Sequence, residues 1–195
     1  MQQNSRRLAE EAARILLDEA IQDYGVAKRK ARERLGLPPS IALPKNVEVE
    51  EALIGLQLLF GGEQHTARLR TMRETALQAM HALAEFRPRL VGPVLAGTAT
   101  EHSPVNLHLF ADAAEEVLMA LMGLRIPFEP FERRLRTRAG AGYEEFPALR
   151  FVAGETPIEV TVFPLEGVRQ APLSPIDGKP MRRAGPDEVR ALLQA

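Results

Sequence analysis

The sequence predicts an α+β protein, in which a helical N-terminal region is followed by a small mixed β-sheet packed with helices. Apolar residues recur at helical spacing through roughly the first 86 residues. Beyond Arg87-Pro88 they form short runs bounded by glycine and proline, and several of these runs alternate with polar residues. We place the boundary after Gly61-Gly62, which gives a helical region of residues 1–62 and an α+β domain of residues 63–195.

Three long helices are expected before the strands. The first has Ser5 as its cap, Gly25 as a candidate interruption and Gly36 as its end. A proline-containing loop over residues 37–46 follows. The second helix covers about Val47–Phe60, with Asn46 as its cap and glutamates in the first turn that complement the helix dipole. The third covers about Gln64–Phe86.

The remaining elements alternate between strands and helices. A helix is predicted to open at the capping-box pattern Asp112-Ala-Ala-Glu115 and to end at Gly123. The last helix opens at Gly185-Pro-Asp-Glu188, because proline suits the first helical position. The final two strands should form a hairpin across Gly154-Glu155. The expected strands are Leu90–Ala96, Val105–Ala111, Ile126–Leu135, Leu149–Ala153 and Pro157–Phe163.

Composition limits the classes of function. The chain has no cysteine, which excludes disulfides, thiolate zinc sites and cysteine nucleophiles. Its formal net charge of −1 gives no overall attraction to nucleic acid or to membranes. The N-terminus lacks the apolar run of a signal peptide, and no stretch approaches the length of a membrane span. We therefore expect a cytoplasmic protein without a membrane partner, whose oligomeric state the sequence leaves open.

Polar residues occupy one face of two predicted strands. Successive side chains of a strand point to opposite faces, so Val105, Leu107 and Leu109 should enter a core while Asn106, His108 and Phe110 share the other face. In the same way Glu159 and Thr161 lie opposite the apolar residues of their strand. Two interpretations of this face remain open, a functional cleft and a solvated sheet surface.

The segment Leu95-Ala-Gly-Thr98, the polar strand, the helix after it and a later strand with one acid together resemble the nucleotidyltransferase fold of the DNA polymerase beta superfamily. In that family a glycine pair follows the first strand, an Asp-x-Asp or Asp-x-Glu pair lies on the next strand, and a third carboxylate lies on a later strand. Together they hold magnesium for nucleotidyl transfer. The resemblance assigns the glycine position to Gly97-Thr98, the paired positions to Asn106 and His108, and the third position to Glu159.

The departures from the family pattern predict binding rather than catalysis. Magnesium prefers oxygen ligands, usually carboxylates, and only one of the three family positions here is a carboxylate. We therefore expect a catalytically degenerate nucleotidyltransferase-like protein that binds a nucleotide or a nucleotide-bearing partner. The alternative is an active nucleotidyltransferase with an atypical metal, held by His108 and Glu159 as candidate ligands. Magnesium or manganese would be a cofactor only in an active enzyme.

Basic segments supply candidate phosphate ligands. Lys179, Arg182 and Arg183 lie in a proline-rich segment and are assigned to nucleotide binding together with Gly97 and Thr98. A further hypothesis is a nucleic-acid-binding or adapter protein that uses the basic segments 28–34 and 179–183. For residues 28–34 we favour intramolecular pairing, with acids of the preceding helix available, or plain solvation, and for Arg133–Arg138 a charged, solvated edge strand.

Overall fold

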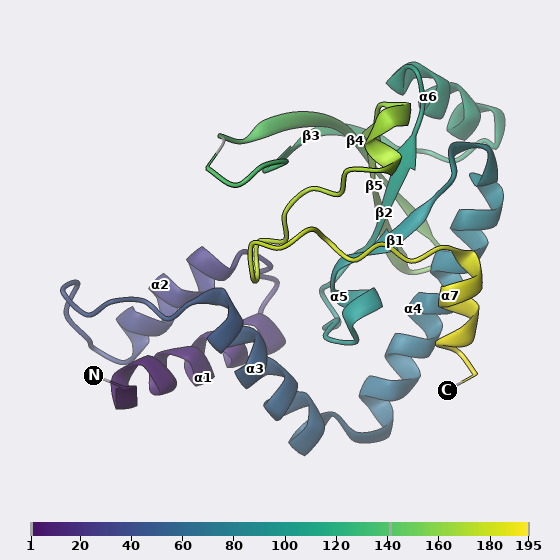
Figure 1. Ribbon diagram of the computed structural model, residues 1–195. Coiled ribbons are helices and arrows are strands. Elements are labelled where there is room, and N and C mark those ends of the chain that lie inside the picture. Colours follow the sequence, from purple (N-terminus) through teal and green to yellow (C-terminus); the bar gives the residue numbers. More distant parts are fainter. Residues whose placement is uncertain (1, 141, 195) are drawn as a thin grey trace. The chain divides into compact units, whose positions relative to one another are not determined.

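The computed structural model describes residues 2–140 and 142–194, and these residues form two compact units. Unit 1 contains the chain up to Arg68 together with Thr98–Ser103 and Pro175–Asp177, whereas unit 2 contains Leu69–Gly97, Pro104–Ser174 and the chain from Gly178. Figure 1 labels their helices and strands. No helix in this described part of the chain is long and apolar enough to cross a membrane.

Unit 1 is helical. The first predicted helix is in fact two, α1 (Gln2–Asp18) and α2 (Tyr24–Arg34), because Asp23 starts a new helix by accepting a hydrogen bond from the Val26 amide at 2.7 Å. The break therefore precedes Gly25. The helices α1, α2 and α3 (Asn46–Leu56) share one core, which includes Leu8, Ala12, Ile15, Ala27, Ala31, Val49 and Leu53.

The second predicted helix also differs at both ends. Its cap is Lys45 rather than Asn46, because the Glu48 carboxylate accepts a hydrogen bond from the Lys45 backbone amide at 2.6 Å. The α-helix ends at Leu56 and widens into a π-helical turn, η1 (Gln57–Gly61), which leads directly into α4 (Gly62–Ala82). Gly61-Gly62 therefore does not separate two helices by a loop, and the exposed side chains of η1 include Leu58, Leu59 and Phe60.

Unit 2 is built on a five-stranded mixed sheet with the strand order β1-β2-β5-β4-β3. β2 and β5 are parallel, and the other neighbouring pairs are antiparallel. The predicted α+β class and the predicted hairpin across Gly154-Glu155 are therefore confirmed. The strands are β1 (Arg89–Val91), β2 (Val105–Phe110), β3 (Glu129–Leu135), β4 (Glu144–Ala153) and β5 (Thr156–Phe163).

The first strand of the sheet is shorter than the predicted strand Leu90–Ala96. β1 ends at Val91, and residues from Gly92 form the short helix α5 (Gly92–Ala96). Pro93 explains the change, because proline cannot donate to a strand ladder but fits the first turn of a helix. The chain turns at Gly92 with φ of 72°, a left-handed value that suits glycine.

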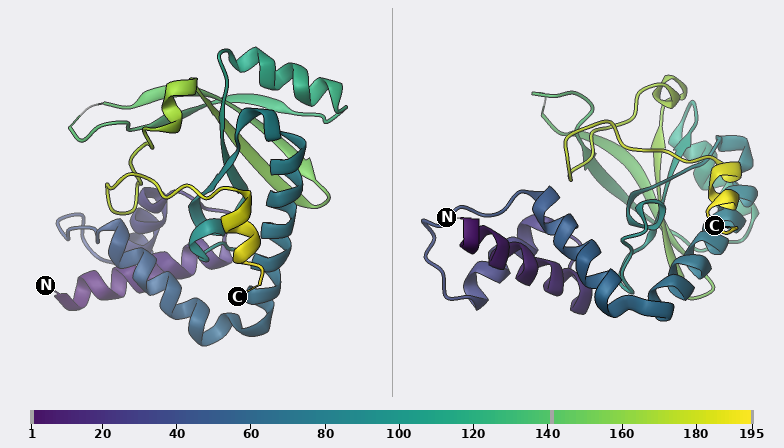
Figure 2. Two further views of the ribbon diagram at one scale, coloured as in Figure 1. Left: turned by 45° about the vertical axis from the view of Figure 1, so that its right-hand side comes forward. Right: turned by 60° about the horizontal axis from the view of Figure 1, so that its bottom comes forward.

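Helices complete unit 2. α6 (Ala114–Gly123) begins one residue later than predicted. Its cap is Ala113, whose backbone amide donates a hydrogen bond to the Glu116 carboxylate at 3.1 Å, and Glu115 does not accept this bond. β3 starts at Glu129 and not at Ile126, after a left-handed turn at Arg125. The last helix, α7 (Pro186–Ala191), opens at Gly185 as predicted. It lies beside α4 in both views of Figure 2, and short 3-10 turns η2 (Ala84–Phe86) and η3 (Leu165–Val168) complete the unit.

The two faces of the central strands differ in chemistry, and most residues of both faces are buried. Val105, Leu107 and Leu109 are buried in the core, as the alternation predicts. On the opposite face His108, Glu159 and Thr161 are buried as well. The interpretation of this second face as a solvated sheet surface is therefore wrong, and its polar groups need partners within the protein.

Candidate functional site

Strand register brings the polar residues into one row. Asn106 of β2 is the cross-strand partner of Glu159 in β5, and Glu159 is in turn the partner of Arg150 in β4. Side chains of directly paired residues project from the same face of a sheet. His108 is two residues beyond Asn106, so it lies on this face too, opposite Thr161. The face that carries Asn106, His108 and Glu159 is called the polar face below.

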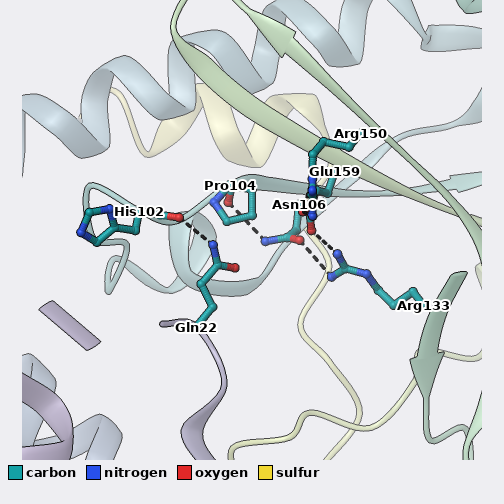
Figure 3. A network of polar contacts seen from close by, with 7 residues as sticks. All are labelled: Gln22, His102, Pro104, Asn106, Arg133, Arg150 and Glu159. Atoms are coloured by element: carbon teal, nitrogen blue, oxygen red, sulfur yellow. Dashed lines mark hydrogen bonds and ion pairs between the residues drawn. The ribbon is translucent and has the colours of Figure 1, made fainter. Parts of the chain in front are cut away.

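The Glu159 carboxylate is held by two arginines (Figure 3). Arg150 donates to Oε1 from Nε at 2.9 Å and from Nη2 at 2.7 Å, and Arg133 of β3 donates from Nη2 to Oε2. The Arg133 Nη1 atom also donates to Oδ1 of Asn106 at 3.1 Å. The Arg133 guanidinium thus bridges two of the three positions that the resemblance assigns to metal ligands.

Burial in this cluster decreases from the acid to the bases. The Glu159 side chain is 9% exposed, that of Arg133 27% and that of Arg150 52%. Both guanidinium groups also lie over the Phe131 ring, each 5.4 Å from its centroid. One edge of the cluster is therefore open to solvent while the carboxylate beneath is not. β3 is an edge strand of the sheet, as expected, but its Arg133 is only partly exposed and is bound to Glu159 and Asn106.

His108 has a different partner, Arg183. The Arg183 Nε atom donates to Nδ1 of His108 at 3.0 Å, and its guanidinium lies 5.0 Å from the Phe110 centroid and 5.1 Å from that of Phe163. Its Nη1 atom donates to the Gly167 carbonyl at 2.6 Å, whereas Nη2 is buried without a partner among the described residues.

Burial, and then the charges of Arg183 and Arg133, hold the pKa of His108 well below its usual range. The imidazole is therefore neutral, and because Nδ1 accepts a hydrogen bond, its proton lies on Nε2. Burial, and then the charge of Arg89, lower the pKa of Arg183 to about 10. At neutral pH the contact thus joins a neutral histidine to a charged arginine.

The glycine beside the polar face is Gly92. A Cβ atom built at Gly92 would lie 3.5 Å from Nδ2 of Asn106, whereas one built at Gly97 would approach Nη2 of Arg73 at 3.8 Å. Gly92 directly follows β1. Gly92 is therefore the glycine that lies against Asn106, and the assignment of Gly97 to the glycine position stays a prediction.

The other predicted nucleotide ligands are distributed over both units. Gly97 and Arg182 both lie near Arg73, whose pKa is lowered by burial and then by the charge of Arg182. Thr98 belongs to unit 1, where its carbonyl accepts a hydrogen bond from Gln57 Nε2 at 3.0 Å. The same loop is held in unit 1 by Gln22, which donates to the His102 carbonyl at 2.6 Å, and Figure 3 includes this bond. Lys179 closes a turn in which its carbonyl accepts from the Ser174 amide at 2.7 Å.

The basic helix of unit 1 is paired internally. Lys28 donates to the Pro44 carbonyl at 3.0 Å and to Asn46 Oδ1 at 2.7 Å. Lys30 pairs with Glu19, and Arg34 pairs with the same carboxylate at 2.6 Å. Of the two expected alternatives, intramolecular pairing or plain solvation, these three basic residues show intramolecular pairing.

Sequence reasoning assigned no role to three residues of the candidate site, namely Gly92, Arg73 and Arg150, and it gave Arg133 no partner on the polar face. The only signal for Arg150 was its alternation on a predicted strand, which placed it on one face without naming a partner. Within residues 2–140 and 142–194, no group of three or more His, Cys, Asp or Glu side chains is arranged to hold a metal ion. Comparisons with protein-family models, with curated proteins and with solved structures found no match.

Proposed function

We propose that this protein is a nucleotidyltransferase-like protein that has lost catalysis and binds a nucleotide through its phosphates, without a metal ion. The single observation that carries the proposal is the Arg133 guanidinium, which lies between Asn106 Oδ1 and Glu159 Oε2. In the family that the sequence resembles, a magnesium ion would lie between ligands at these positions. Here the chain supplies the positive charge itself.

The donor set does not fit magnesium. Both oxygens of Glu159 accept hydrogen bonds from arginines, and Oδ1 of Asn106 accepts one from Arg133. The Nδ1 atom of His108 accepts from Arg183, and a neutral imidazole is a poor ligand for magnesium. A cation entering this row would displace a guanidinium group that is already bound.

The same arginines are suited to phosphate. A guanidinium group presents several N–H donors in a fixed plane and binds phosphate oxygens in pairs. Arg150 uses Nε and Nη2 for Glu159, so Nη1 is not used for that acid, and half of this side chain is exposed. Phosphate groups would therefore bind over Arg150 and the exposed edge of Arg133, while Glu159 fixes the orientation of both.

The experiment is a titration with each of the four ribonucleoside triphosphates, followed by thermal unfolding. A ligand that binds only the folded protein at 100 times its Kd adds about 2.7 kcal/mol to the free energy of unfolding. We expect one or more nucleotides to raise the Tm equally in magnesium and in EDTA. Arg150→Gln should abolish the rise, whereas Arg70→Gln, which removes an exposed arginine paired with Glu74, should leave it unchanged.

Two results would overturn parts of this proposal. The absence of any rise in Tm with all four nucleotides would refute nucleotide binding. Transfer of a labelled nucleotide that requires magnesium and is lost in Glu159→Gln would refute the loss of catalysis. No observation in the structure favours the alternative enzyme with an atypical metal or the use of residues 28–34 for nucleic acid.

A further inference from the structure

The β3–β4 hairpin extends beyond the rest of the sheet. β4 begins at Glu144, but its pairing with β5 begins only at Ala148. The residues of β4 before Ala148 therefore pair with β3 alone, through Leu135↔Glu144 and the pairs that follow. Figures 1 and 2 show this part as a two-stranded ribbon that extends away from β5. The residues Arg134, Arg136, Arg138 and Tyr143 at its end are called the hairpin tip below.

An exposed tyrosine at the hairpin tip has two arginines beside its ring. The Tyr143 residue is 56% exposed. The guanidinium carbon of Arg136 is 4.7 Å from the centroid of its ring, and that of Arg134 is 5.6 Å away. Both arginines are exposed. Arg134 is on the opposite side of β3 from Arg133, which turns to Glu159, and Arg136 follows the end of the strand. The Tyr143 ring and the two guanidinium groups therefore form an exposed surface outside the hydrophobic core.

Positive charge exceeds negative charge at this tip. Glu145 pairs with Arg134 at 3.5 Å, and Glu144 accepts a hydrogen bond from the Thr137 hydroxyl. Among the described residues, neither Arg136 nor Arg138 forms an ion pair with a carboxylate. The chain as a whole has a net charge of −1, so this excess is local.

A second basic segment is joined to the same tip within unit 2. The Leu173 amide donates to the Arg136 carbonyl at 2.6 Å, and Leu173 forms a bridge with Pro180. Lys179 precedes this bridge and Arg182 follows it. The two basic segments that the sequence singled out separately, residues 133–138 and 179–183, are therefore adjacent at the hairpin tip.

We propose that the hairpin tip is a binding surface for single-stranded nucleic acid, with bases stacked on Tyr143 and phosphates bound by Arg136 and Arg138. Bases stack on aromatic rings and on arginine planes without regard to sequence, and arginines beside the ring neutralise the backbone. Single strands are the ligand because their bases are free to stack, whereas the bases of a duplex are not. The surface shares no residue with the site proposed for a nucleotide, so each proposal can fail alone.

The test uses the full chain and a fluorescein-labelled single-stranded RNA of about 15 nucleotides, a length that covers one extended binding surface. Binding is measured by fluorescence anisotropy over a range of salt concentrations. Tyr143→Ala should weaken binding about five-fold or more, because it removes the stacking ring, and Tyr143→Phe should retain it. Arg136→Gln should lower the dependence of log K on log salt by about one phosphate contact. Arg70→Gln in α4 is the matched control.

Three outcomes overturn the proposal. They are no binding of the single strand at low salt, equal affinity of wild type and Tyr143→Ala, and binding to phosphatidylserine vesicles without binding to RNA. A duplex of the same length should compete poorly, and equal competition would also contradict stacking. Circular dichroism of each variant verifies folding. If Tyr143→Ala does not fold, Arg136→Gln and Arg138→Gln serve as the test variants. Each should lower the dependence of log K on log salt, and an unchanged dependence in both would refute the proposal.

Discussion

Replacing Glu159 by glutamine should destabilise the sheet of unit 2 by about 2 kcal/mol. Removing one partner of a fully buried ion pair costs about 3–5 kcal/mol, because the remaining charge is left without compensation. Here the acid is 9% exposed, but Arg133 and Arg150 are 27% and 52% exposed, so water can solvate both once the charge is gone. Glutamine also retains one acceptor for Arg150. These two effects reduce the expected loss to the lower value.

The measurement is urea unfolding followed by far-ultraviolet circular dichroism, with hydrogen exchange of the β5 amides to locate the effect. A loss of this size lowers the Tm of a chain of this length by roughly 4–8 °C. Glu145→Gln is the matched control, because it removes the same charge from an exposed pair in which the acid is 57% exposed, and it should cost less than about 1 kcal/mol. Equal costs for the two variants would refute the conclusion that Glu159 organises the two arginines.

Further predictions concern stability. Burial and then the charge of Arg183 hold the pKa of His108 below 6.5, so below about pH 6.5 the unfolded chain binds a proton that the folded chain does not. The free energy of unfolding should therefore fall as the pH drops below about 6.5, by up to about 1.4 kcal/mol per pH unit. Urea unfolding of His108→Gln should show a flatter profile between pH 5 and 6.5, and an unchanged slope would contradict a neutral His108. Gly92→Ala should cost about 1–2 kcal/mol, because Gly92 has a left-handed φ of 72° that alanine adopts only with strain. Gly123→Ala is the control and should be near neutral or stabilising, because a Cβ atom there has no neighbour within 4 Å. Equal effects of the two substitutions would refute the conclusion that the left-handed backbone at Gly92 requires glycine. Leu107→Ala should cost about 2–5 kcal/mol in the same assay, and a loss under about 1 kcal/mol would show that Leu107 is not in a packed core.

Local patterns in the sequence predicted much of the fold. The alternation around Leu107 predicted both the strand and its buried side, because side-chain direction in a strand follows from the backbone alone. Gly185-Pro186 predicted the start of the last helix for a similar local reason. Boundaries that depend on competing local signals were wrong, as at Val91, where Pro93 ends a strand that the apolar run would have continued.

The sequence alone determined which side of its own strand each polar residue occupies, because alternation places Asn106 and His108 opposite the core residues of β2 and Glu159 opposite those of β5. Only the tertiary structure decided what those residues bind. Arg133 is 26 residues from Glu159 in the chain and 27 from Asn106, and it reaches both because β3, β4 and β5 pair in one particular register. Register depends on the whole sheet, and shifting it by one residue would turn the arginines away from the acid. The partners of Glu159 and His108 therefore could not be read from either strand by itself.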